Sequence, residues 1–337
     1  MPHNSRGVGA LEFVPLARAR GVEVYAARSG YVSFFSSPFT PHLLGAAVDI
    51  SDSLDFGEEA PSPVSGTVER VVEIDSGPGR FERTDYMISI VPEENPELRV
   101  KLMHVIPSVS PGERIEVGDP LGCYSRTNYF AYHNLPHVHV EVCEDPSLRP
   151  SSALELELCL DLEPELAPAG VGDERLVVEV VDVREDFAIC RPVRPRAPLG
   201  EASGALGLLN GELGVGLGHL GLIFLDEKPV LGSAVHLCGA LAGYVARVRD
   251  WYAMALPERR DFDEWLLESQ SIASLLPGGP AHTERSPVEV ISEEVPLAGL
   301  ELLISRGCAI KLIPRPRHDL GLEQGDAVTI RLRSRRP

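Results

Sequence analysis

The stretch Pro136-His137-Val138-His139-Val140-Glu141-Val142 decides how the first half of this chain folds. Its valines alternate with polar residues, and this period of two predicts a β-strand with His137, His139 and Glu141 on one face. Two imidazoles at positions i and i+2 can both reach one metal ion, or one can bind it while the other handles protons. The alternative is a surface strand with a solvated polar face, and Glu141 is then solvated instead of supporting an imidazole.

A carboxylate lies inside a second predicted strand, Ala46-Ala47-Val48-Asp49-Ile50. A carboxylate among apolar residues is costly unless it is paired, hydrogen-bonded or bound to a metal. The alternative is that Asp49 only opens the polar loop that follows it. The preceding segment, 36–45, contains prolines, a glycine and His42, and is predicted to be a loop.

The remainder of the first half is predicted to be almost entirely β. Short strands are expected at 60–71, 85–91 and 98–105, separated by turns, and no stretch before residue 150 has a convincing helical period. This pattern is typical of a β sandwich or an open barrel.

Five motifs occur in an order that resembles the lysostaphin/LytM-type zinc metallopeptidases, a family of glycyl-glycine endopeptidases. Pro-His-Leu-His-Phe-Glu of the family matches 136–141 closely, and its Tyr-x-His-Leu segment matches Leu102-Met103-His104-Val105 loosely. The resemblance covers about residues 30–148. The other motifs are the family's first zinc-binding segment, its Pro-Val strand pair and its Gly-Asp turn, and they correspond to 42–49, 63–68 and 117–122.

This resemblance implies a site for one zinc ion. His42, Asp49 and His139 would be the ligands, and His104 and His137 would be the non-ligating catalytic pair that orients water or stabilises the oxyanion. Two imidazoles and one carboxylate leave the fourth zinc position open for water, as in catalytic sites. The implied activity is hydrolysis of an amide bond in a peptide or peptide crosslink.

The first ligand departs from the family pattern. The family has its first histidine four residues before the aspartate, where this chain has Gly45; His42 lies seven residues before Asp49. On a continuous strand His42 would be on the opposite face from Asp49, about 23 Å away. His42 can therefore be a ligand only if the chain bends between the two residues, which Gly45 permits.

The second half is predicted to be a β-rich accessory domain. The expected division is a LytM-like domain over 1–150, a linker over 151–173 rich in Leu, Glu, Pro and Ala, and the second domain over 174–337. Its one clear helix is predicted over 261–276, with a capping box at Asp261 and Glu264. His219 and His236 lie in apolar surroundings typical of core histidines. No catalytic constellation is recognised here, and three roles stay open for this half: positioning of substrate, self-association and binding of a partner.

Composition restricts the partners of this 337-residue chain. The formal net charge of -19 argues against nucleic acid and anionic membranes as general partners. No signal peptide or membrane span is predicted, and six scattered cysteines fit a reducing compartment, so a cytoplasmic location is expected. Two alternatives to a peptidase stay open: a LytM-like binding or regulatory module without hydrolytic activity, and a structural role for the zinc.

Overall fold

The computed structural model describes residues 11–159, 175–193, 199–215, 218–224, 227–275, 288–292, 295–305 and 309–334. Strands dominate these ranges, which contain only two α-helices, α1 (Thr40–Leu43) and α2 (Phe262–Leu275), and one short 3-10 helix (Pro150–Ser152). The prediction of a mainly β protein is confirmed.

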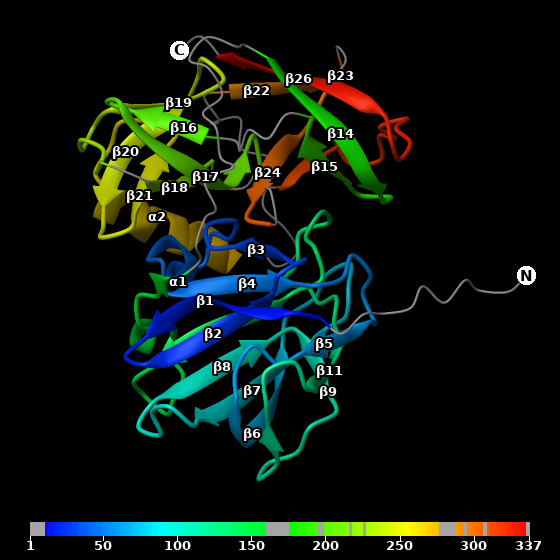
Figure 1. The fold of residues 1–337 in the computed structure, drawn as a ribbon, viewed down its shortest axis with the longest axis vertical. Helices are drawn as coiled ribbons and strands as arrows, with labels where there is room; N and C mark the ends of the chain where they lie inside the picture. The colour runs from blue at the N-terminus through cyan, green and yellow to red at the C-terminus, as the bar shows by residue number, and fades with distance from the viewer. Residues whose placement is uncertain are drawn as a thin grey trace, which may run out of the picture.

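A seven-stranded antiparallel sheet forms the centre of the first half (Figure 1). Its strand order is β10-β6-β7-β8-β12-β4-β3, which places the His-x-His strand β12 between β8 and β4. The strands are β3 (Tyr31–Ser33), β4 (Ala47–Ser51), β6 (Gly66–Asp75), β7 (Thr84–Pro92), β8 (Arg99–Met103), β10 (Arg114–Ile115) and β12 (Val138–Cys143).

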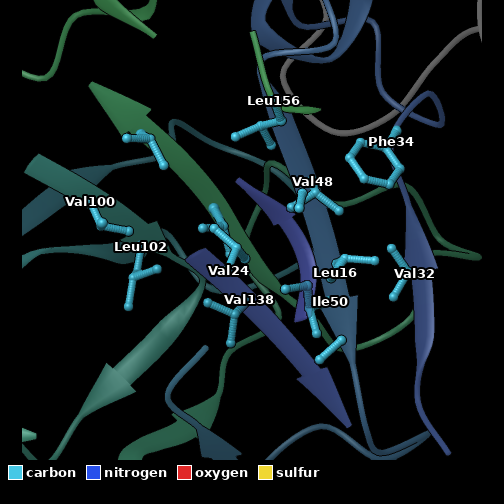
Figure 2. Close-up of a cluster of buried hydrophobic side chains, with 14 of the residues drawn as sticks. Leu16, Val24, Val32, Phe34, Val48, Ile50, Val100, Leu102, Val138 and Leu156 are labelled. Carbon is cyan, nitrogen blue, oxygen red and sulfur yellow. The ribbon is translucent and has the colours of Figure 1, made fainter. Parts of the chain in front are cut away.

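Two three-stranded sheets, β13-β1-β2 and β5-β11-β9, accompany the seven-stranded sheet. Their strands are β1 (Phe13–Ala19), β2 (Val22–Ala27), β5 (Glu59–Pro61), β9 (Val105–Pro107), β11 (Pro120–Tyr124) and β13 (Glu157–Leu158). Apolar residues that alternate along these strands meet in the core of the first half, which Figure 2 shows. Its buried members include Leu16, Val24, Val48, Ile50, Val100, Leu102 and Val138.

The second half contains one continuous sheet of 13 strands. Within it β16 pairs with both β19 and β17, so the six strands β16-β19-β20-β21-β18-β17 close into a barrel. These strands are β16 (Leu199–Ala202), β17 (Ala205–Leu213), β18 (Leu220–Phe224), β19 (Ala234–Leu237), β20 (Ala240–Val248) and β21 (Tyr252–Leu256). The others are β14 (Arg175–Val183), β15 (Ala188–Pro192), β22 (Val288–Ser292), β23 (Val295–Pro296), β24 (Gly299–Leu303), β25 (Ala309–Ile313) and β26 (Ala327–Ser334).

The two halves pack directly on each other, with α1 and α2 at the junction (Figure 1). Val32 of β3 exchanges backbone hydrogen bonds with Ile304, at N···O distances of 2.8 and 3.0 Å. One hydrophobic cluster contains residues of both halves, among them Phe34 and Phe35 of the first and Tyr252 of the second. Apolar burial therefore holds the halves together.

Several expectations for the second half can be compared with the structure. Asp261 caps α2, since its Oδ1 accepts hydrogen bonds from the backbone N–H groups of Asp263 and Glu264 at 2.9 and 3.1 Å. His219 is buried as expected, but His236 is exposed, because it points outward from β19. Most of the predicted linker lies outside the described residues.

Neither helix in the described part of the chain combines the length and the hydropathy that a membrane crossing requires.

Candidate metal centre

Three side chains converge on one point at the edge of the core. His42 Nε2 lies 3.0 Å from His139 Nδ1 and 3.3 Å from Asp49 Oδ1, and His139 Nδ1 lies 3.0 Å from the same carboxylate oxygen. These donor atoms lie within 4.8 Å of one another and could hold a metal ion. Asp49 and His139 meet because β4 and β12 pair antiparallel with these two residues directly opposite each other.

His42 reaches Asp49 because the chain reverses at Gly45. Helix α1 lasts one turn, and Gly45, with φ +66°, ends it in the left-handed conformation. The Gly45 N–H donates to the His42 carbonyl at 3.1 Å and the Ala46 N–H donates to the Pro41 carbonyl at 2.7 Å. These two bonds form a Schellman C-cap, which needs glycine at this position because residues with a Cβ rarely adopt positive φ. The bend that the sequence requires is therefore present.

Hydrogen bonds on the outer side of each imidazole select its tautomer. His42 Nδ1 lies 2.9 Å from the Phe34 carbonyl oxygen, and His139 Nε2 lies 2.8 Å from Glu141 Oε1. Carbonyl and carboxylate oxygens only accept, so these two nitrogens carry the protons. In the neutral imidazoles the lone pairs of His42 Nε2 and His139 Nδ1 then face each other and the Asp49 carboxylate. Three lone pairs at this separation repel unless a proton or a metal ion lies among them, so the arrangement can hold a metal ion in place of a proton.

The second pair of predicted histidines adjoins this group. The rings of His104 and His137 are nearly perpendicular, with centroids 5.2 Å apart, and His137 Nε2 lies 3.6 Å from Asp49 Oδ2. His137 Nδ1 donates to the Leu135 carbonyl at 2.8 Å. His104 adopts a left-handed backbone conformation, with φ 71°, that a non-glycine residue rarely takes and that recurs at functional sites. All five predicted site residues are thus brought together.

The site is nearly closed to solvent. The five side chains are between 2% and 13% exposed. Strand β12 is buried along its length, so the interpretation of its polar face as a solvated surface is wrong. Glu141 is likewise buried and hydrogen-bonded to His139, because β12 is an interior strand of the sheet.

Burial and charge shift the pKa values of the site in opposite directions. Burial lowers the pKa of His137 to about 4, against the attraction of Asp49. Burial also opposes the charged form of His139, but hydrogen bonds to Asp49 and Glu141 raise its pKa to about 9. Asp49 is held well below its usual pKa despite burial, because His137, His42 and His139 surround it. A deprotonated carboxylate is the form that binds metal.

Three supporting residues were not predicted from the sequence. The buried carboxylate of Asp85 accepts from His104 Nδ1 at 2.6 Å and from Thr127 Oγ1 at 3.1 Å. Lys101 Nζ lies 2.9 Å from Glu141 Oε1 and neutralises that carboxylate. Lys101 could have been singled out from the sequence, because the chain has three lysines and this one lies between two apolar strand residues. No feature of the sequence indicates the role of Asp85, because its partner His104 is distant in sequence.

Two residues of the loop before β12, Tyr132 and His133, lie at the junction of the halves. The Tyr132 hydroxyl donates to the Pro314 carbonyl at 2.7 Å. His133 belongs to the same loop and is buried, with Nδ1 3.6 Å from Glu212 Oε1 of β17.

Comparisons with known proteins assign no role to this site. The family model "Domain of unknown function (DUF8155) N-terminal domain" matches residues 22–158, a range that contains all five predicted site residues. No curated protein matches the chain. A solved structure described as "NMR solution structure of lysostaphin" aligns with 13% identity over 63% of this chain and 95% of that chain, with a TM-score of 0.28. A likeness of this extent is too small to support an inference.

Proposed function

We propose that this chain is a zinc-dependent metallopeptidase that hydrolyses an amide bond in a peptide or a peptide crosslink. The observation that supports it is the convergence of His42 Nε2, Asp49 Oδ1 and His139 Nδ1, which lie within 4.8 Å of one another. Two imidazoles and one carboxylate are a frequent ligand set of catalytic zinc. When bound, zinc would lower the pKa of a water molecule and polarise the scissile carbonyl group.

His137 and His104 suit different roles beside this ligand set. His137 donates its Nδ1 proton to a backbone carbonyl, so the lone pair of its Nε2, near Asp49, can accept a proton from water. His104 donates its Nδ1 proton to Asp85, and this hydrogen bond orients its ring. In its protonated form, His104 would donate from Nε2 to a developing oxyanion.

A second candidate is a LytM-like module in which the metal has a structural or regulatory role and nothing is hydrolysed. Its support is the low exposure of the five side chains, since a peptide backbone needs access to the metal. Both candidates predict bound metal, and only the first predicts turnover.

The test is zinc content by mass spectrometry, beside Asp49→Ala, His42→Ala and His139→Ala. About one zinc per chain in the parent, and loss of zinc in all three variants, is the expected result. A parent that stays free of zinc after reconstitution would overturn both candidates and leave a binding module whose metal site has decayed. Incubation of the zinc form with a mixed peptide pool and a glycine-rich crosslinked peptide, followed by mass spectrometry of the products, then separates the peptidase from the module.

A further inference from the structure

The second half of the chain has no role in the proposed function, yet it surrounds the segment that carries His42. This segment, residues 34–45, contains α1 and the Gly45 turn. It is the part of the site that departs from the family pattern, since His42 reaches Asp49 only through that turn. Side chains of the second half contact the segment at both of its ends.

At the first end, Asn210 of β17 holds the residue to which His42 is anchored. Asn210 Oδ1 accepts from the Phe34 N–H at 2.8 Å, and Asn210 Nδ2 donates to the Leu302 carbonyl at 2.9 Å. The Phe34 carbonyl in turn accepts from His42 Nδ1 at 2.9 Å. This chain of hydrogen bonds runs from β24 through Asn210 and Phe34 to the ring of His42, and it fixes the tautomer that directs Nε2 to the site.

At the other end, Tyr252 of β21 contacts the turn at Gly45. Its hydroxyl donates to the Leu44 carbonyl at 2.8 Å, at the C-terminus of α1. Its ring lies so close to the turn that a Cβ on Gly45 would be 2.7 Å from the Tyr252 hydroxyl oxygen. Glycine is thus required at position 45 both for its positive φ and for the approach of this tyrosine.

Phe35, next to Phe34 at the first end of the segment, packs its ring against Gly221 of the barrel. A Cβ added to Gly221 of β18 would lie 2.0 Å from the Phe35 ring. Trp251 and Tyr252 complete the surroundings, with ring centroids 6.0 and 5.0 Å from that of Phe35. The glycine-rich composition of this part of the second half therefore makes room for the segment that carries His42.

We infer that the second half positions the first metal ligand, with Asn210 and Tyr252 as positioning residues that hold His42 Nε2 over Asp49. This inference rests on the proposed metal site and assigns a role within it to strands β17, β18 and β21. Neither residue touches the metal point; each acts through the backbone of residues 34–45.

The experiment compares the full-length parent with Tyr252→Phe and Asn210→Ala. Tyr244→Phe is the matched control, because Tyr244 lies on the neighbouring strand β20 beneath the Arg259 guanidinium. Three quantities are measured: zinc affinity by competition with a chelator, the absorption spectrum of the Co²⁺ form, and amide hydrogen exchange of the metal-free protein. The amides of Leu44, Gly45 and Ala46 are the reporters, since all three donate within the turn.

We expect Tyr252→Phe and Asn210→Ala to weaken zinc binding about 10-fold, the lower end of the effect of removing residues that orient ligands. The Co²⁺ spectrum should change in both, which general destabilisation would not cause, and the reporter amides should exchange faster. If Tyr252→Phe has the zinc affinity, Co²⁺ spectrum and amide exchange of the parent, the inference is overturned, even if Asn210→Ala does not fold. A parent without zinc affinity would overturn the proposed function instead, and the exchange of the metal-free proteins would still decide whether Tyr252 holds the turn.

Discussion

Glu141 Oε1 lies 2.8 Å from His139 Nε2, on the side of the imidazole opposite to Asp49. The two residues are two positions apart on β12, so the pleat alone places both side chains on one face. Lys101 on the neighbouring strand β8 pairs with the same carboxylate and lies directly across from Glu141 in the register. Burial opposes ionisation of Glu141, but His139 and Lys101 lower its pKa to about 2, so it is charged at neutral pH.

Glu141→Gln is therefore expected to weaken zinc binding about 10- to 100-fold, because the amide no longer raises the basicity of the ligating imidazole. Zinc affinity by chelator competition measures the effect. Glu73→Gln, at an exposed position of β6 in the same sheet, is the control and should bind as the parent does. Equal affinities of Glu141→Gln and the control would show that Glu141 does not support the ligand.

Asp85→Asn is expected to reduce peptide hydrolysis by about 10²-fold or more while zinc content stays at the parental level. The reason is that an uncharged amide cannot complement positive charge on the His104 ring during turnover as the carboxylate that accepts its Nδ1 proton does. The rate constant kcat and the zinc content are measured side by side. Asp75→Asn, which alters an exposed ion pair with Arg83, should leave both unchanged. Loss of zinc from Asp85→Asn would instead indicate a role in metal binding.

The parts of the site that the sequence predicted are those that follow from local geometry. Alternation along residues 136–142 placed His137, His139 and Glu141 on one face. The requirement for a bend between His42 and Asp49 followed from the reach of an extended strand. The Schellman turn at Gly45 satisfies that requirement through two backbone hydrogen bonds within six residues. Local rules of this kind depend on residue type and spacing alone.

The parts that were missed depend on strand register and on contacts between the halves. Asp85 meets His104 because β7 and β8 pair with a particular offset, and no pattern near either residue indicates that pairing. Asn210 and Tyr252 reach residues 34–45 across more than 170 positions of sequence. The closed barrel was likewise not predicted, since a barrel and an open sheet have the same alternation along each strand.

His137→Ala and His139→Ala are expected to separate catalysis from metal binding. His139→Ala should lose zinc, because its Nδ1 is one of the three converging donors. His137→Ala should keep zinc and lose hydrolysis by about 10²-fold or more, since it removes the proposed proton acceptor but no ligand. Zinc content and product formation are determined on the same preparations. Zinc loss in His137→Ala would place that residue among the ligands and contradict the division of roles.

A buried charge cluster at the junction of the halves leads to a prediction about pH and stability. Glu212, Glu301 and Lys311 lie opposite one another on β17, β24 and β25, and Lys311 pairs with Glu301. Burial, and then repulsion by Glu301, raises the pKa of Glu212 to about 8, although Lys311 opposes the shift. An unfolded glutamate titrates near 4.3, so between about pH 4.3 and pH 8 the folded chain holds a proton that the unfolded chain has lost.

Because the folded state binds more protons in this window, the free energy of unfolding should fall as pH rises, by up to about 1.4 kcal/mol per pH unit from this group. Glu212→Gln keeps the shape of the neutral acid but cannot ionise, so it should remove this part of the pH dependence. Urea unfolding of both proteins at pH 5, 6, 7 and 8, in the presence of a chelator, measures the difference. Between pH 5 and pH 8 the variant should lose less of its free energy of unfolding than the parent does. Parallel pH profiles of the two proteins would show that Glu212 is ionised in the folded protein throughout.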